Sequence, residues 1–149
     1  MNDSIHPSAD HGLNLGKGGT HAARPSSCKV RCVAGRALIR DFGEVEQLQV
    51  SRKGPADFVS TADKKAEKII MQELSRARPD YGFLMEEGGK VEGEDPNRRF
   101  IIDPLDGTTN FLHGLPHFAV SIGLEEKGEI IAGCVYDPIK DEMFWAEKG

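Results

Sequence analysis

The sequence lacks the features that would mark it as a membrane, nucleic-acid-binding or disulfide-rich protein. Its 149 residues contain no apolar run near the ~20 residues that a membrane helix needs. The net charge is −5, so the basic excess that accompanies direct nucleic-acid binding is missing. There are three cysteines, and the first twenty residues contain no apolar core of a secretory signal. We therefore expect a cytoplasmic protein with reduced thiols and no membrane association.

Periodicity divides the chain into a tail and one domain. Residues 1–32 are rich in Gly, Ser, Asn, His and Pro without any apolar repeat, which predicts a disordered or aberrant tail. Cys28 and Cys32 lie in CKVRC, but no matching second pair follows, so we expect no metal site there. Residues 33–149 have the length and patterning of a folded domain.

Two helices are predicted near the start of this domain. Apolar residues recur at helical spacing over 33–42, and Gly54-Pro55 indicates a turn after an irregular stretch. A second helix, with one apolar face, is expected to begin at a cap on Ser60 or Thr61 and to stop at Pro79.

Strand patterns fill the remainder of the chain. A short strand at 81–85 and another at 99–103 flank a polar loop, and three strands with period-two alternation follow, at 117–125, 129–137 and 142–147. Lys127-Gly128 reads as the turn of a hairpin. The sequence therefore predicts an α+β fold, a layered α-β-α sandwich in which helices pack on a largely antiparallel sheet.

Three acidic residues lie where two of the short strands end. Glu86 follows the first strand, Asp103 ends the second, and Asp106 lies one tight turn further on. Neighbouring strand ends would bring these carboxylates together, and Mg²⁺ prefers such oxygen ligands, with a backbone carbonyl such as that of Leu105 beside them. Alternatively, Asp103 and Asp106 cap a turn and residues 108–110 only begin a helix. The Asp-x-x-Asp spacing alone leaves both interpretations open.

The residues that follow this pair suit an anion. Gly107 permits a tight backbone, and its N–H, together with that of Thr108, can point toward a phosphate oxygen. The Thr108 hydroxyl is placed to orient a water molecule.

Three sequence blocks together resemble the inositol monophosphatase family of Mg²⁺-dependent, lithium-sensitive phosphomonoesterases. The blocks are PADFVSTADKKAEKII, FLMEEGG and FIIDPLDGTTNFLHGLPHFAVSIGL, in the order and spacing of the family. The resemblance runs from about residue 34 to the last residue. It implies a water molecule that attacks phosphorus, activated by two or three Mg²⁺ ions, and inhibition by Li⁺.

The resemblance also implies a role for each matching residue. Metal ligands would be Glu86, Asp103, the Leu105 carbonyl and Asp106; Asp63 and Thr108 would orient the water; Gly107 and Thr108 would hold phosphate; and Glu87 would support the ligands from outside.

The same resemblance implies that only the N-terminal portion of the family's sequence is present. The family's Trp-Asp-x-Ala-Ala-Gly block, whose aspartate completes a metal site, does not occur here. The expected substrate is a small phosphorylated polyol, an inositol monophosphate first. A related sugar or nucleotide phosphatase and a non-catalytic metal-binding or interaction module are the alternatives. A full-length form would be a homodimer.

Overall fold

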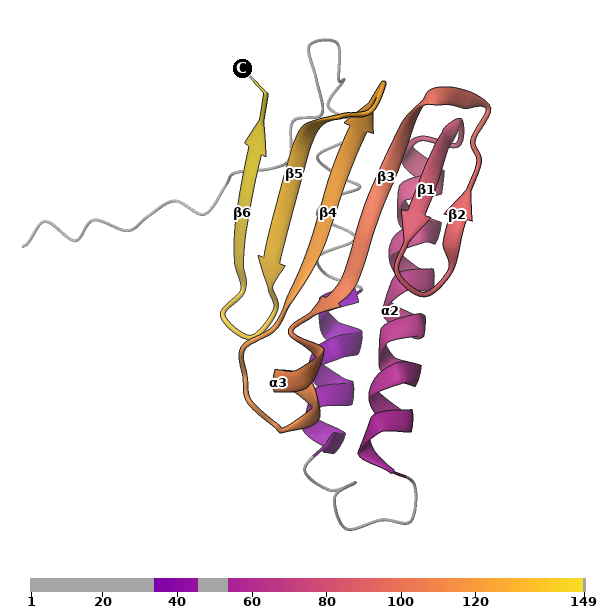
Figure 1. Cartoon of the computed structure of the whole chain (residues 1–149). Coiled ribbons are helices and arrows are strands. Elements are labelled where there is room, and N and C mark those ends of the chain that lie inside the picture. Colours follow the sequence, from indigo (N-terminus) through magenta and orange to yellow (C-terminus); the bar gives the residue numbers. More distant parts are fainter. Residues whose placement is uncertain (1–33, 46–53, 149) are drawn as a thin grey trace, which may run out of the picture.

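A computed structural model describes residues 34–45 and 54–148 of the chain, which form one mixed sheet with helices on it (Figure 1). The sheet has six strands in the order β2-β1-β3-β4-β5-β6. Strands β1 and β3 are parallel, and all other neighbours are antiparallel. The sheet is therefore largely antiparallel, as the sequence predicted. The elements are a helix over 34–45, α2 (Pro55–Ala77), β1 (Tyr81–Met85), β2 (Gly89–Val91), β3 (Asp95–Asp106), α3 (Thr108–Leu112), β4 (Ala119–Glu126), β5 (Glu129–Asp137) and β6 (Glu142–Glu147).

In Figure 1 the upper part of α2 passes behind β1 and β3, and the helix over 34–45 lies lower, behind α3. Buried residues of both helices and of the strands form one core. Strand alternation explains which side chains reach the core: Phe100 and Ile102 of β3 are buried, whereas Ile101 and Asp103 between and after them are only half-buried on the opposite face. We call that opposite face the open face of the sheet. Among the described residues, no helix is both long and apolar enough to cross a membrane.

Helix α2 begins earlier than predicted. It starts at Pro55, with Gly54 as the preceding cap residue, so the expected cap at Ser60 or Thr61 was wrong. Proline is favoured at the first helical position because its fixed φ suits the helix and its missing N–H needs no partner there. The Thr61 hydroxyl instead donates to the Asp57 carbonyl, 2.8 Å away, from inside the helix. The Gly54-Pro55 step is a helix start, not a separate turn.

Other boundaries also differ from the prediction. The first helix continues through Gly43 to residue 45, and Val33 lies outside the described residues. The predicted polar loop contains β2 and the beginning of β3, because β2 pairs with β1 and Asp95 pairs with Tyr81. Strand β4 begins at Ala119, not at residue 117. The hairpin at Lys127 and Gly128 is confirmed, and both residues have the positive φ that suits such a turn.

A bulge interrupts β3 at its end. Asp103 pairs with Ser121 and Asp106 pairs with Ala119, so two residues on β3 face one on β4. Bulges bend a strand and redirect its side chains, and they recur beside functional sites. Here the bulge buries Pro104 and Leu105 and leaves Asp106 exposed between β3 and α3.

Candidate active site

Strand register brings Glu86 and Asp103 together. Met85 of β1 pairs with Ile102 of β3, so the next residue of each parallel strand lies at the same edge of the sheet. Burial raises the pKa of Asp103, and the Asp106 charge raises it further, while the Leu105 N–H partly offsets both. The Asp103 charge is the main cause that raises the pKa of Glu86, which also hydrogen-bonds Asp103. These two carboxylates therefore repel each other when both are ionised.

The turn after Asp103 is fixed by short-range hydrogen bonds. The Leu105 N–H donates to Asp103 Oδ1 at 3.1 Å, and the Thr108 hydroxyl donates to the Leu105 carbonyl at 3.0 Å. Leu105 lies between the two aspartates in the sequence, and its carbonyl is held beside Thr108 by the second of these bonds. A carbonyl oxygen has two lone pairs, so this bond leaves one for another ligand.

Asp63 approaches this edge of the sheet from α2. It is 4% exposed, and its Oδ1 has no hydrogen-bond partner. Burial, followed by the charges of Glu87, Glu86 and Asp103, raises the pKa of Asp63 from 3.8 to about 7. Carboxylates just after β1 and near the end of β3 thus act electrostatically on a carboxylate of α2, although α2 is separate from them in the sequence.

Gly107 connects β3 to α3 in a conformation that few other residues adopt. Its φ is +94°, and a Cβ there would lie 3.1 Å from the His117 carbonyl oxygen. Thr108 then begins α3, so the helix-start interpretation of residues 108–110 is correct. It does not compete with a ligand role, because Thr108 is exposed beside Asp106.

The structure adds one acidic residue that the sequence analysis overlooked. Glu67 lies on α2 one helical turn after Asp63 and is 5% exposed. Its Oε2 accepts the Glu87 N–H at 2.9 Å, and its Oε1 accepts the Gly88 N–H at 2.7 Å. The Asp-x-x-x-Glu spacing on the apolar side of a predicted helix was the available signal. The Glu87 side chain itself lies 3.9 Å from the Lys64 ammonium, in an exposed pair.

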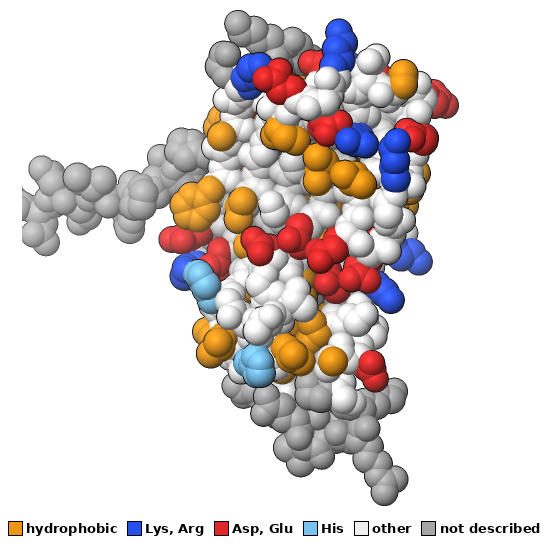
Figure 2. Space-filling view, viewed as in Figure 1, with side chains coloured by type: hydrophobic (Ala, Val, Ile, Leu, Met, Phe, Trp, Pro, Cys, Tyr) orange, Lys and Arg blue, Asp and Glu red, His pale blue; other side chains and the backbone are white. Residues whose placement is uncertain are grey.

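Acidic side chains form a band across the open face, with basic side chains at its two ends (Figure 2). Carboxylates and a peptide carbonyl are the ligands of a hard cation, and the unpaired Asp63 oxygen and the mutual repulsion of Glu86 and Asp103 suit one. Within residues 34–45 and 54–148, however, no three His, Cys, Asp or Glu side chains already converge as a complete metal site. The chemistry of the donor set suits Mg²⁺, and the exposed Glu86 and Asp106 side chains would have to turn toward Asp103 to complete a site.

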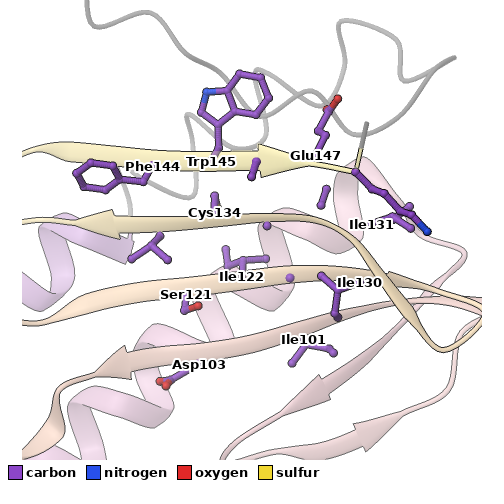
Figure 3. Close-up of a pocket in the computed structure, with 16 residues that line it drawn as sticks. Ile101, Asp103, Ser121, Ile122, Ile130, Ile131, Cys134, Phe144, Trp145 and Glu147 are labelled. Carbon is purple, nitrogen blue, oxygen red and sulfur yellow. The ribbon is translucent and has the colours of Figure 1, made fainter.

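A shallow hollow on the open face extends away from Asp103 (Figure 3). Its volume is about 720 Å³, and its lining is mainly apolar, with Ile101, Ile130 and Phe144 among its side chains. Asp103 and Ser121 lie together at one side of it in Figure 3. The hollow therefore begins at the acidic edge and continues over apolar strand residues.

The remaining candidates keep their ordinary roles or lie outside the described residues. His113 and His117 are exposed, and the His117 carbonyl accepts the Asn110 amide at 2.8 Å. Cys134 is buried in the core, which raises its pKa to about 11. Cys28, Cys32 and the predicted tail over 1–32 lie outside the described residues.

Comparison with known proteins gives consistent matches. Residues 24–149 match the model of the inositol monophosphatase family. The inositol-1-monophosphatase of Mesorhizobium japonicum is 67% identical over 116 residues, which are 78% of this chain and 44% of that protein. The Nus factor SuhB of Vibrio cholerae is 45% identical, over 78% of this chain and 43% of that protein.

A solved structure agrees with these matches. The extragenic suppressor protein suhB of Bartonella henselae is 63% identical, with a TM-score of 0.73, over 84% of this chain and 48% of that one. The chain thus spans less than half the length of the relatives it matches.

Proposed function

The chain belongs to the inositol monophosphatase family, and from this premise we propose that it forms the Mg²⁺-binding portion of a phosphomonoesterase acting on an inositol monophosphate. The observation that carries the proposal is that Glu86 and Asp103 adjoin at one edge of the sheet, where their charges raise the pKa of the buried Asp63 on α2. Family membership and the name of the Mesorhizobium relative support the substrate class.

Mg²⁺ is the expected cofactor, at two or three sites held by Glu86, Asp103, the Leu105 carbonyl and Asp106. Bound there, it would neutralise phosphate charge and lower the pKa of a water molecule, and Li⁺ is expected to inhibit. Glu87 would support these ligands through the turn that it shares with Glu86.

The chain's own groups would position and deprotonate the attacking water. Asp63 has an unpaired Oδ1 that can accept a proton from water, and its pKa of about 7 lies near the working range of a general base. The Thr108 hydroxyl donates to the Leu105 carbonyl, so its oxygen can accept a hydrogen bond from the other O–H of the same water. The N–H groups of Gly107 and Thr108 would hold a phosphate oxygen.

Phosphate release from inositol 1-phosphate tests this function, with the chain alone and joined to the C-terminal portion of a relative. We expect Mg²⁺-dependent release that falls at least ~100-fold in Asp103→Asn, because supporting residues outside the ligand shell already cost 10–100-fold. Release without Mg²⁺, or no loss in the variant, would contradict the proposal. Competition with other sugar and nucleotide phosphates would identify the substrate, and light scattering would test a homodimer of the full-length form.

A non-catalytic metal-binding or protein-interaction role is the second candidate. The observation that favours it is the name Nus factor on relatives such as that of Vibrio cholerae. Calorimetry separates the two roles: weak Mg²⁺ binding and no turnover, together with a defined protein partner, would favour the interaction role.

A further inference from the structure

The turn between β1 and β2 is tied to α2 by a single buried side chain. The turn comprises Glu86, Glu87 and Gly88, because Met85 pairs with Gly89 across it. Each carboxylate oxygen of Glu67 accepts one N–H of this turn, from Glu87 at 2.9 Å and from Gly88 at 2.7 Å. A carboxylate that accepts successive backbone N–H groups holds both peptides in one orientation.

The shape of the turn is matched to this contact. A Cβ at Gly88 would lie 2.9 Å from Glu67 Oε1 and 2.9 Å from the Met85 side chain. Real Cβ atoms do not approach other atoms so closely, so a Cβ there would force the Glu67 carboxylate or the Met85 side chain to shift. The second contact between α2 and the turn, Lys64 with Glu87, is long and exposed and cannot hold the turn by itself.

The position of Glu67 on α2 connects the turn over 86–88 to Asp63. Asp63 and Glu67 are four residues apart, so they share one face of the helix. The same helix therefore presents the Asp63 carboxylate and grips the peptides that directly follow Glu86. The separation between Asp63 and Glu86 depends on that grip.

We propose that Glu67 is a positioning residue: it clamps the turn over 86–88 to α2 and thereby sets Glu86 beside Asp103 for divalent-cation binding. The clamp itself is independent of any activity, whereas its effect on the cation rests on the proposed function. Gly88 also contributes to the clamp, because its N–H donates to Glu67 Oε1.

Three variants of the full chain test the clamp, with amide hydrogen exchange and Mg²⁺ calorimetry as readouts. Glu67→Gln keeps the side-chain shape but replaces one acceptor with a donor. Gly88→Ala keeps every charge and displaces the turn. Glu73→Gln is the matched control, since Glu73 lies on the same helix and pairs with Arg76 rather than with the turn. Circular dichroism establishes that each variant is folded.

We expect faster exchange at Glu87 or Gly88, and Mg²⁺ affinity at least ~10-fold weaker, in both Glu67→Gln and Gly88→Ala, with neither change in the control. Unchanged exchange in Glu67→Gln would overturn the clamp. Weaker Mg²⁺ binding in Glu67→Gln but not in Gly88→Ala would mean that Glu67 acts by charge, which overturns positioning. If the unaltered chain binds no Mg²⁺, the proposed function fails, and the exchange rates still decide whether the clamp exists.

Discussion

The two ends of strand β3 hold acidic side chains in opposite ways. At its beginning, Arg98 pairs with Glu126 and Arg99 with Glu125 directly across the ladder to β4. The Arg98 Nε lies 2.8 Å from Glu126 Oε1, and the Arg99 Nη2 lies 3.1 Å from Glu125 Oε2. We call this the paired end. Each acid there is neutralised within the protein.

At the other end of β3, Asp103 adjoins Glu86 and Asp106. The Asp103 charge raises the pKa of Glu86, and the Asp106 charge helps to raise the pKa of Asp103. We call this the acidic end. Repulsion between these carboxylates lowers the stability of the chain when they are ionised. The difference indicates that acids at the paired end serve the fold, whereas those at the acidic end suit a cation from outside.

The largest expected effect is a fall in metal-free stability as pH rises. The pKa of Asp63 is about 7 in the folded chain and near 3.8 in the unfolded one, so the folded state binds the extra proton between these values. The Asp63 contribution to stability is therefore full below about pH 4 and is lost as pH rises through about 7, by up to ~4 kcal/mol. Urea unfolding in a chelator at a series of pH values measures this slope.

The control for this slope is Asp63→Asn, which cannot ionise and should lose the Asp63 part of it. Excess Mg²⁺ should also flatten the slope in the unaltered chain, because a cation favours the ionised carboxylates. Equal slopes in the two chains without metal would show that Asp63 is not buried among like charges.

A smaller effect is expected from Glu86→Gln. Removing one charge from the acidic end should stabilise the metal-free chain by about 1 kcal/mol or less, because the group is exposed and screened. The same change should weaken Mg²⁺ binding, so the gain should disappear when Mg²⁺ is added. Thermal unfolding with chelator measures the expected gain in stability, and thermal unfolding with Mg²⁺ measures whether that gain disappears. Glu129→Gln serves as the control, since Glu129 pairs with Lys148 at the far edge. A loss of stability in Glu86→Gln without metal would contradict the contrast.

The sequence predicted that Glu86 and Asp103 lie together, because both residues are found at strand ends. Glu86 and Asp103 each come immediately after an apolar run, and parallel pairing of those runs is sufficient to bring them together. The bulge between Asp103 and Asp106 was not predictable from alternation, since it depends on which β4 residue each one meets.

The sequence prediction failed where a local residue pattern is compatible with two structures. Gly54-Pro55 is typical of a turn, yet proline is equally suited to a first helical position, and this is where α2 begins. Glu67 was passed over because an acid on a helix is usually solvated, and only the fold reveals the two N–H groups that it meets. Contacts between elements that are distant in the sequence determine both the start of α2 and the role of Glu67.

The smallest expected effect is at the paired end. Glu125→Gln keeps the shape of the side chain and removes the charge that faces Arg99. Both side chains are partly exposed, so we expect a loss of only about 0.2–1 kcal/mol, the range of such pairs. A double-mutant cycle with Arg99→Gln, followed by urea unfolding at low and high salt, isolates the pair and should give a coupling that shrinks with salt. The sign is the decisive point: removal of an acid must destabilise here and stabilise at Glu86. If Glu125→Gln stabilised the chain, acids at both ends of β3 would destabilise the metal-free fold, and the contrast between the two ends would be wrong.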